Sequence, residues 1–559
     1  MYREILMKGT PEELSVAVID NQQLSEIYFE RLFKNRLIGN IYKGHVDSVL
    51  PGMQAAFVDI GLEKNSFLYV EDAVPKKIDE FGREQGGEKK SINQILHKGQ
   101  EIVVQIFKEP FGSKGARVTM NLTFPGRYLV LLPGCNYIAI SRRIDDENER
   151  NRLKSLAKSL LPTGVGAIIR TAAQGMSEKE LSGDIKMLSK QWKRIQGKAV
   201  KSKAPSLLYA DLALAERIIR DTATMSVNRI LINNREMHEK MQETAAVMAP
   251  SLVPKIILKE TEDPFNMYNV QAQIEQALYR KVWLKSGGYL IIDQVEALTV
   301  IDVNTGKYVG KDNLSATILR TNLEAATEIS RQLRLRNIGG IIIVDFIDMD
   351  KQDDKNELIA VLEKEVKKDR TKVTVLGLTR LGLVEMTRKK RGQSLMMTLE
   401  KECPFCQGKG RVLSEASIDA HIRQEIKMIA DTSDAPAIHI KAHTSVASYL
   451  LGPAGHSLEG LEKKYRKKIT VCGDASLRME NFVVRPSYEE ITSYIQSPVK
   501  TGQKVKLKID STHREHLSDG LSRVNGFIIH IIDGGNRVGQ EVEVTVTKVL
   551  PTYAKAQIN

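Results

Sequence analysis

The hydrophobic pattern of the first 35 residues predicts three strands. The segments REILMKG, LSVAVID and LSEIYFER alternate apolar and polar positions, as half-buried strands do. Three strands without a helix cannot close a core of their own. We therefore expect residues 1–35 to pack against a later part of the chain.

A different pattern begins at residue 36, where short β-rich runs alternate with glycine-containing turns. This pattern is typical of a small closed barrel. A polar stretch at 75–98 predicts a long exposed loop before the strands resume. Within this predicted barrel we expect Phe57 and Phe67 to lie near four cationic residues, Lys43, His45, Lys64 and Lys114. Aromatic faces among cations suit stacking of unpaired bases; alternatively, both rings fill the barrel core.

The central part of the chain predicts mixed helices and strands. Residues 120–215 combine short strands with charged helices, and 216–280 add two strands and a helix. Residues 287–306 read as two strands joined by a tight turn. A helix with one apolar stripe should follow, capped by Asp312; its stripe residues are Leu314, Ile318, Leu323, Ile329 and Leu333.

The apolar run Ile341–Val344 predicts a buried strand, followed by a helix at 353–368 and the strand KVTVLGL. Beyond a basic segment at 387–394, residues 413–486 predict a small α+β unit. Residues 498–559 predict a second small barrel.

Composition narrows the choice of protein class. The 559 residues are 42% hydrophobic and 27% charged, so we expect a globular protein of several domains. The net charge of +13 favours polyanionic partners, nucleic acid first. Four cysteines are too few for a disulfide scaffold. No segment resembles a signal peptide or an ~18-residue membrane span, so we expect a soluble, cytoplasmic protein.

Acidic residues stand in or after two of the apolar strands. Asp302 and Asn304 share one face of the strand ALTVIDVN, and Asp345 ends the strand GGIIIVD. Two neighbouring carboxylates repel each other unless a hard cation lies between them. Mg²⁺ accepts such a site and completes its shell with water and phosphate oxygens. The reaction class that uses this arrangement is phosphodiester hydrolysis.

The alternative interpretation is a set of surface acids that cap helices or pair with basic residues of the preceding helix. The basic candidates are Arg331, Arg334 and Arg336. Acids at the start of the next helix favour a role as partners of the helix dipole; they are Asp350, Asp353 and Asp354.

The segment Cys403-Pro-Phe-Cys406 predicts half of a zinc site, because four thiolates are a usual structural complement. Cys135 and Cys472 are isolated in the sequence. Two chains that each donate one CxxC knuckle would complete the ligands and form a dimer. A redox dithiol or an incidental pair remains the alternative.

Taken together, DFIDM, EALTVIDVN, RQLRLRNIGG and the CPxC knuckle resemble the ribonuclease E/G family, and the length is similar to its ribonuclease G-like type. The resemblance covers residues 1 to about 485. It implies a magnesium-dependent endoribonuclease that cuts single-stranded RNA, is stimulated by a 5′-monophosphate, and serves mRNA and rRNA processing, maturation or decay.

The resemblance also implies residue roles. Asp302 and Asp345 would hold catalytic Mg²⁺, with Asn304 orienting Asp302. Phe57, Phe67 and Lys114 would grip RNA. Arg170 and Thr171 would sense the 5′-phosphate, for which an arginine fork and a hydroxyl are suitable donors. Cys403 and Cys406 would share structural Zn²⁺ between the chains of a homodimer, alone or in a dimer of dimers.

The fold that the resemblance implies is a multidomain α/β chain with no small-molecule cofactor. Its parts are a ribonuclease-H-like subdomain (1–35 plus 216–280), an inserted OB-type, S1-like barrel (36–119), a 5′-phosphate sensor region (120–215), a catalytic deoxyribonuclease-I-like subdomain (281–400), a zinc-link (401–412) and a small α+β domain (413–486). Residues 498–559 resemble a TRAM-like RNA-binding barrel, which goes beyond the basic family plan.

A rival from another class is a non-catalytic RNA-binding or ribosome-assembly factor. Its difficulty is the acid pair, since carboxylates repel the phosphates that a pure binder must attract. A zinc nuclease built on the knuckle is disfavoured, because closed thiolate sites leave no open coordination position.

Overall fold

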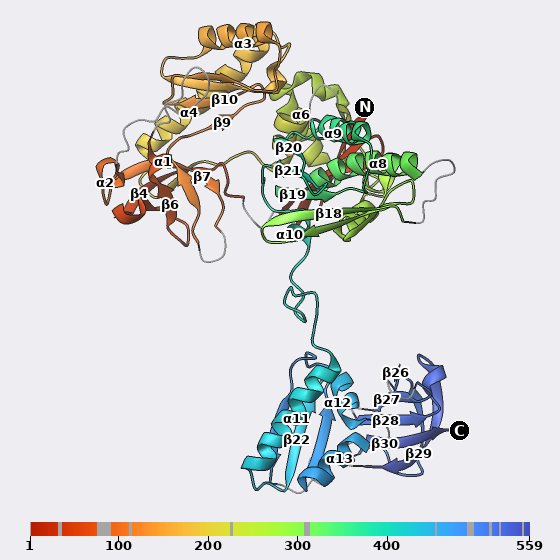
Figure 1. Cartoon of the computed structure of the whole chain (residues 1–559). Coiled ribbons are helices and arrows are strands. Elements are labelled where there is room, and N and C mark those ends of the chain that lie inside the picture. The colour runs from red at the N-terminus through yellow and green to blue at the C-terminus, as the bar shows by residue number, and fades with distance from the viewer. Residues whose placement is uncertain are drawn as a thin grey trace. The chain divides into compact units, whose positions relative to one another are not determined.

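A computed structural model describes residues 2–31, 36–74, 91–110, 114–223, 227–306, 314–452, 456–488, 497–513, 517–524, 527–550 and 553–559. The chain divides into two compact units, Met1–Leu399 and Glu400–Asn559 (Figure 1). Within the described ranges, no helix is both long enough and apolar enough to span a bilayer.

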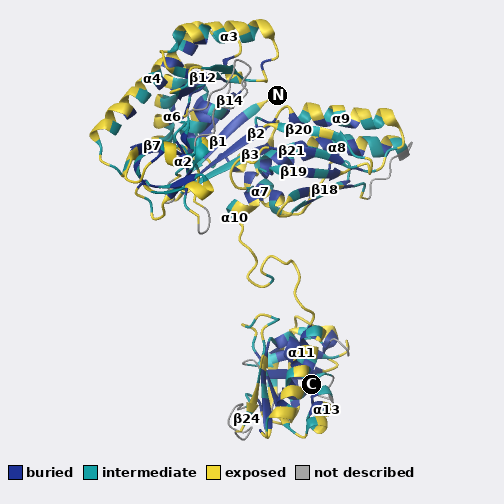
Figure 2. Ribbon diagram, turned by 60° about the vertical axis from the view of Figure 1, so that its left-hand side comes forward, coloured by how far each residue is buried: buried dark blue, intermediate teal, exposed yellow. Residues whose placement is uncertain are grey.

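The N-terminal strands lie in a sheet with strands from much later in the chain. In order across the sheet, the strands are β15 (Ile256–Leu258), β14 (Val227–Ile232), β1 (Arg3–Gly9), β2 (Glu13–Asp20) and β3 (Gln23–Arg31). The parallel pairing of β1 with β14 supplies the later partner that the first three strands need. β1 and β2 are buried along most of their length (Figure 2).

Helices cover both faces of this sheet. Residues of α5 (Leu214–Arg217) and α6 (Arg235–Met248) share an apolar cluster with one face. Residues of α7 (Val270–Leu278), together with Leu335 at the end of a later helix, cover the other face. The sheet is therefore a central layer of the first unit.

A closed five-stranded barrel follows β3, which confirms that prediction. Its strands, in order, are β4 (Ile41–Leu50), β5 (Ala55–Asp59), β6 (Ser66–Tyr69), β8 (Arg117–Thr119) and β7 (Glu101–Lys108), and β7 pairs back onto β4. β13 (Ser206–Tyr209) pairs with the first residues of β4, Ile41 to Lys43, before β5 begins to pair with that strand. α1 (Val70–Ala73) follows β6.

The prediction of an exposed loop at 75–98 is wrong for the last residues of that range. Residues 75–90 lie outside the described residues, but α2 (Ile92–Ile95) is a helical turn. Ile92 and Leu96 are buried in the barrel core. These two apolar side chains stand in a polar stretch, and they are buried because they join the apolar cluster of the barrel strands, which local periodicity does not predict.

The part between the barrel and β14 is a small sheet with two helices. The sheet order is β11 (Ile138–Ile140), β12 (Val165–Ile169), β10 (Leu129–Pro133) and β9 (Phe124–Pro125). α3 (Glu147–Leu160) and α4 (Glu178–Lys201) pack on it through one apolar cluster. A capping box between Ser177 and Glu180 begins α4.

The last layer of the first unit is a six-stranded mixed sheet. Its order is β16 (Lys281–Trp283), β17 (Tyr289–Gln294), β18 (Leu298–Asn304), β19 (Gly340–Asp345), β21 (Val384–Arg388) and β20 (Val373–Leu378). α8 (Leu314–Leu335) and α9 (Gln352–Val366) share its buried apolar cluster. The hairpin and the two helices lie where the sequence predicts them, but the Asp312 cap falls outside the described residues. α10 (Leu395–Leu399) closes this unit.

The second unit holds two small folds. α11 (Glu415–Thr432), α12 (Thr444–Leu451) and α13 (His456–Tyr465) accompany a three-stranded sheet. Its strands, in order, are β23 (Lys468–Gly473), β22 (Ala437–Ala442) and β24 (Val483–Ser487). The C-terminal sheet consists of β25 (Lys504–Lys508), β29 (Glu541–Val549), β30 (Tyr553–Ile558), β28 (Phe527–Ile532), β27 (Gly520–Val524) and β26 (Ser511–Thr512). Leu521, Ile528 and Tyr553 share a buried cluster with the helical part.

Candidate active site

Two carboxylates face each other across neighbouring strands of the six-stranded sheet. β18 and β19 run in parallel, and their register pairs Asp302 directly with Asp345. Residues paired in this way project to the same face, and the strands lie about 4.8 Å apart. Both acids are exposed. Their neighbours along the strands, Ile301, Val303 and Val344, are buried on the opposite face. The fold therefore brings the predicted acid pair together.

Asn304 holds one of these carboxylates in place. Its Nδ2 donates a hydrogen bond to Asp302 Oδ2 at 2.8 Å. The two side chains can meet because residues i and i+2 of a strand share one face. The amide thereby restricts the rotation of the Asp302 carboxylate.

The electrostatics of the pair favour a cation. Burial, the neighbouring charge of Asp302 and the charge of Asp348 raise the pKa of Asp345. A raised carboxyl pKa beside another carboxylate means that the ionised pair is destabilised until positive charge arrives. Among the described residues no group of three or more His, Cys, Asp and Glu side chains could hold a metal. Two carboxylates suffice for Mg²⁺ when water and substrate phosphate complete its shell, so the donor set fits that ion.

The acids that follow β19 have a different setting. Asp353 and Asp354 occupy the first turn of α9, where a negative charge is stabilised by the helix dipole. Asp350 is an exposed residue just before that helix.

The barrel carries an aromatic surface outside its core. The rings of Phe57 on β5 and Phe67 on β6 meet edge to face at 6.0 Å, and both side chains are half-buried. Their strand neighbours Ala56, Val58 and Leu68 are fully buried and form the core instead. The alternative in which both rings merely fill the barrel is thus wrong. Both rings lie on a surface that a flat ligand can reach.

Further residues that the sequence reasoning missed extend this surface. The ring of Tyr69 stacks near Phe67 at 6.3 Å. The guanidinium of Arg117 lies 5.8 Å from the Tyr69 ring and 4.9 Å from the Phe107 ring. The alternation along β6 could have predicted Tyr69 as part of this surface, because Phe67 and Tyr69 alternate with the buried Ser66 and Leu68.

The predicted cations of the barrel have different positions. Lys114 is exposed and stands three residues before Arg117, whose strand pairs with β6 at Phe67. Lys43 is bound within the chain, to the Ser202 carbonyl at 2.9 Å and to Glu101 at 2.7 Å. His45 lies 3.7 Å from Asp59. Lys114 is therefore better placed for a ligand than Lys43.

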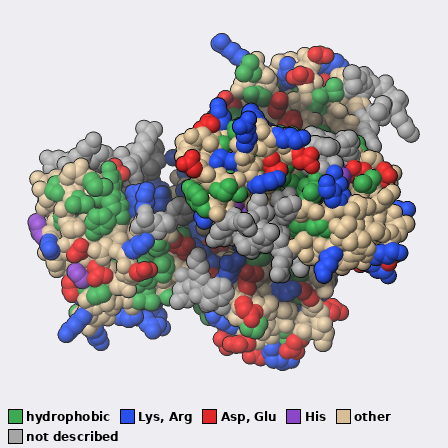
Figure 3. All heavy atoms as spheres, turned by 90° about the horizontal axis from the view of Figure 1, so that it is seen from below, with side chains coloured by type: hydrophobic (Ala, Val, Ile, Leu, Met, Phe, Trp, Pro, Cys, Tyr) green, Lys and Arg blue, Asp and Glu red, His purple; other side chains and the backbone are tan. Residues whose placement is uncertain are grey.

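On the face that Figure 3 draws, the positively charged side chains do not form one uniform surface. Figure 3 shows Lys and Arg side chains over the face that it draws, with Asp and Glu side chains between them. Recognition of a polyanion on that face must therefore depend on local groups rather than on the net charge of +13.

Arg170 belongs to a partly buried network of ion pairs. Its Nη1 donates to the Gly126 carbonyl and to Asp221 Oδ1, both at 2.6 Å. Asp221 is also bound by Arg220 at 2.8 Å. Although burial opposes the charge of Asp221, these two arginines hold the pKa of its carboxyl below the ordinary value. Thr171, the other predicted sensor residue, shares a hydrogen bond of 2.9 Å with Ser141.

A buried carboxylate anchors the loop beside Arg170. Asp184 on α4 accepts backbone N–H bonds from Tyr128 at 2.8 Å and from Arg127 and Leu129 at 3.3 Å. A Cβ at Gly126 would lie 2.5 Å from Asp184 Oδ2, so any other residue there would displace this carboxylate. Burial raises the pKa of Asp184 despite these hydrogen bonds. Sequence reasoning missed Asp184, because one acid in a charged helix carries no distinguishing pattern.

The knuckle of the second unit has thiolate-stabilising geometry. The backbone N–H groups of Cys406 and Phe405 lower the pKa of the Cys403 thiol. Cys403 O accepts from Gln407 N at 2.8 Å, and Cys406 O accepts from Lys409 N at 2.9 Å. All four cysteines of the chain are unpaired.

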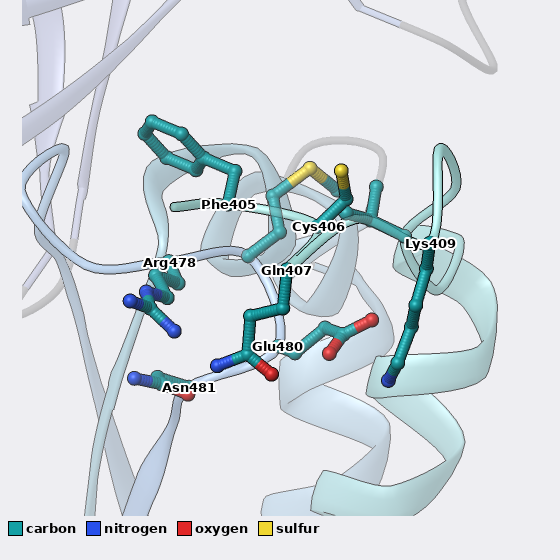
Figure 4. A pocket seen from close by; sticks show the side chains of 9 residues that line it. Phe405, Cys406, Gln407, Lys409, Arg478, Glu480 and Asn481 are labelled. Atoms are coloured by element: carbon teal, nitrogen blue, oxygen red, sulfur yellow. The ribbon is translucent and has the colours of Figure 1, made fainter. Parts of the chain in front are cut away.

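Beside the knuckle lies a cavity of about 310 Å³. Figure 4 shows that residues of two segments line it: Phe405, Cys406, Gln407 and Lys409 from the knuckle, and Arg478, Glu480 and Asn481 from the turn before β24. The knuckle therefore lies beside residues 478–481 of the same unit, and Cys403 is exposed.

The fold is a multidomain α/β chain that brings two carboxylates together on one sheet, and comparison with known proteins gives its class, the ribonucleases, and its family. Residues 123–391 match the Ribonuclease E/G family, residues 402–487 match its thioredoxin-like domain and residues 498–558 match the TRAM domain.

The chain is 42% identical to ribonuclease G of Escherichia coli K12 over 486 residues, which are 87% of this chain and 99% of that protein. It is 35% identical to ribonuclease E of Nostoc over 502 residues, 89% of this chain and 70% of that protein. A solution structure of a conserved protein from Methanococcus maripaludis covers 12% of this chain and 89% of that one, with 24% identity and a TM-score of 0.11. This protein belongs to the ribonuclease E/G family.

Proposed function

We propose that this protein is a magnesium-dependent endoribonuclease that cleaves single-stranded RNA and acts faster on RNA with a 5′-monophosphate. Its family supports endoribonuclease activity in RNA processing. The observation that carries the magnesium assignment is the direct register pairing of Asp302 with Asp345. mRNA and rRNA precursors are the substrates that we propose, in the reducing cytoplasm that four unpaired cysteines favour.

Three residues would perform the hydrolysis. Asp302 and Asp345 would hold Mg²⁺, which when bound polarises a phosphoryl oxygen and lowers the pKa of a bound water. Asn304 keeps Asp302 oriented through its 2.8 Å hydrogen bond. Both carboxylates are exposed, as the approach of a phosphodiester requires.

Two surfaces of the first unit would bind the RNA chain. Phe57 and Phe67 would stack bases, and Lys114 would attract phosphate. Arg170 and Thr171 would receive the 5′-phosphate. The two hydrogen bonds of Arg170 described above use Nη1 alone, so the guanidinium can still offer nitrogens to a phosphate. The TRAM barrel would add RNA affinity.

The finer architecture is part of the same proposal. We assign a ribonuclease-H-like subdomain to the sheet that contains β1 and β14, and a deoxyribonuclease-I-like subdomain to the sheet that contains β18 and β19. Cys403 and Cys406 of two chains would share a structural Zn²⁺ in a homodimer, for which the lowered pKa of Cys403 provides support.

The test uses an unstructured oligoribonucleotide with either a 5′-monophosphate or a 5′-triphosphate. The wild-type protein should cut it with Mg²⁺ and not with EDTA. Asp302→Asn and Asp345→Asn should each abolish cutting while RNA binding persists, and Asp353→Asn in α9 is the matched control that should cut normally. Wild-type cutting by either active-site variant would reject the metal assignment, and binding without any cutting by the wild-type protein would favour the non-catalytic RNA-binding or ribosome-assembly factor.

A further inference from the structure

The edge strand next to the acid-bearing hairpin exposes an aromatic side chain. Trp283 on β16 is 64% exposed, although Val282 and Leu284 on either side of it are buried. Burial of an indole stabilises a protein, and an exposed aromatic group becomes informative when it belongs to a contiguous patch, which can mark a ligand-binding surface. Tyr289 on the neighbouring strand lies beside it.

The register of the sheet places this aromatic pair beside the carboxylates. One row across the strands joins Lys281, Ile291, Asp302 and Asp345. The next row joins Trp283, Tyr289 and Asn304. Residues of one row share a face, so Lys281, Trp283 and Tyr289 lie on the same open face as the acid pair.

The separation suits an adjacent nucleotide. Lys281 is two strand spacings from Asp302, as Trp283 is from Asn304, and two spacings amount to about 10 Å. A phosphodiester held at the acid pair would place its neighbouring base over this part of the sheet.

The three side chains form an ordered cluster. The rings of Trp283 and Tyr289 meet edge to face at 5.4 Å. Lys281 Nζ lies 3.9 Å from the Trp283 ring centre and 3.7 Å from the Tyr289 ring centre. The cation holds both rings in place, so a base would meet a preorganised surface and lose little entropy in ordering it.

Charge explains why a cation is needed at this position. The acid pair repels the RNA backbone on both sides of the reacting phosphate, and Mg²⁺ compensates only locally. The nearest further acid on this face in the same hairpin, Asp293, is already paired with Arg280. Because Asp293 is already paired, Lys281 adds one positive charge beside the carboxylates.

We propose that Trp283, Tyr289 and Lys281 form a subsite for the nucleotide next to the scissile phosphate, with the base stacked on Trp283 and its phosphate near Lys281. This inference rests on the proposed endoribonuclease function and identifies where the substrate chain runs from the acid pair. It makes the cluster a substrate-binding group, distinct from the aromatic surface of the barrel.

The experiment measures kcat/KM on a 5′-monophosphorylated oligoribonucleotide with one defined cut, and on copies with a single abasic residue at each position around it. Trp283→Leu should lower kcat/KM about 5- to 150-fold, the effect of losing one stacked base. Trp283→Phe keeps a ring and should retain most of the rate. One abasic position next to the cut should slow the wild-type protein and leave Trp283→Leu unaffected.

The controls separate this subsite from the rest of the mechanism. Lys281→Ala should lower kcat/KM more at low salt than at high salt, whereas Lys281→Arg should not. Tyr279→Ala removes an aromatic side chain of similar exposure, 67%, that precedes β16, and it should cut normally.

Three outcomes would overturn the inference. If the wild-type protein cuts with Mg²⁺ but Trp283→Leu matches it, the subsite is wrong and the proposed function stands. If Trp283→Leu is slow but each abasic residue slows it as much as it slows the wild-type protein, no base stacks on Trp283. If Trp283→Leu changes the oligomeric state in sedimentation, the face is covered by a second copy of the chain instead of RNA. Failure of the proposed function is recognised separately, by absence of wild-type cutting.

Discussion

Replacement of Asp184 tests whether one buried carboxylate holds the loop that contacts Arg170. Asp184→Ala removes the acceptor of three backbone N–H bonds, from Arg127, Tyr128 and Leu129. One bond is short at 2.8 Å and two are long at 3.3 Å, so we count the short bond fully and the long ones in part.

A hydrogen bond to a charged group contributes about 1.5–3 kcal/mol, and a buried donor left without a partner costs a similar amount. The raised pKa of Asp184 shows that burial offsets part of this gain. We therefore expect Asp184→Ala to lower the free energy of unfolding by about 2–4 kcal/mol. Asp184→Asn retains one acceptor oxygen and should cost about half as much.

The pH dependence has a definite sign. A folded-state pKa above the unfolded value favours the folded state at low pH, and this contribution is lost as the pH rises through the folded pKa. The wild-type protein should therefore lose some stability as the pH rises from about 4 through the raised pKa of Asp184, relative to Asp184→Asn, which cannot titrate.

The assay combines urea unfolding with hydrogen exchange of the amides of residues 127–129, because a chain of two units need not unfold in one step. The exposed Asp145→Ala is the matched control and should change stability by less than about 0.5 kcal/mol. Asp184→Ala should also narrow the rate difference between monophosphorylated and triphosphorylated RNA, since Gly126 in this loop accepts a bond from Arg170. Unchanged amide exchange and an unchanged unfolding midpoint in Asp184→Ala would refute the anchoring role.

Four further predictions concern the site residues. The raised pKa of Asp345 means that Mg²⁺ competes with a proton, so the cleavage rate should rise with pH through that pKa and the midpoint should move to lower pH as Mg²⁺ increases; a midpoint independent of Mg²⁺ would contradict this. Arg170→Ala should narrow the rate gap between 5′-monophosphate and 5′-triphosphate substrates and Arg170→Lys should restore part of it; an unchanged ratio would remove Arg170 from phosphate sensing. Phe67→Ala should weaken single-stranded RNA binding by about 1–3 kcal/mol, measured by titration with an oligoribonucleotide. Val200→Ala, which changes an exposed apolar residue on α4, should leave the RNA affinity unaltered. Cys403→Ser or chelation should shift sedimentation toward the monomer, and persistence of the full oligomer would show that other contacts hold the chains together.

Patterns of local periodicity predicted the elements that carry the acids. Asp302 and Asp345 stood out because each interrupts or ends an apolar strand, and the structure pairs them in register. The alternation along β6 likewise accounts for the position of Phe67 outside the core, since its neighbours Ser66 and Leu68 are buried. These inferences succeeded because they depend on period-two alternation within a single strand.

Contacts between distant segments could not be predicted in the same way. Asp184 meets residues 127–129 across more than 50 positions, and its helix alone does not distinguish it from the other acids. Ile92 and Leu96 are buried because they join the apolar cluster of the barrel strands. Burial of this kind follows from tertiary packing, which a local pattern does not specify.

The row of Lys281, Asp302 and Asp345 shows what register adds to periodicity. Alternation puts each residue on one face of its own strand, but a shift of one residue in either pairing would turn Lys281 to the helix-covered face. The register is specified because Val282, Leu290, Ile301 and Val344 must all reach the same apolar cluster. The buried face therefore determines which side chains meet on the open face. A large-to-small change beneath the row, at Ile301 for example, should then impair cleavage through the alignment of the acids even though its side chain points away from the RNA.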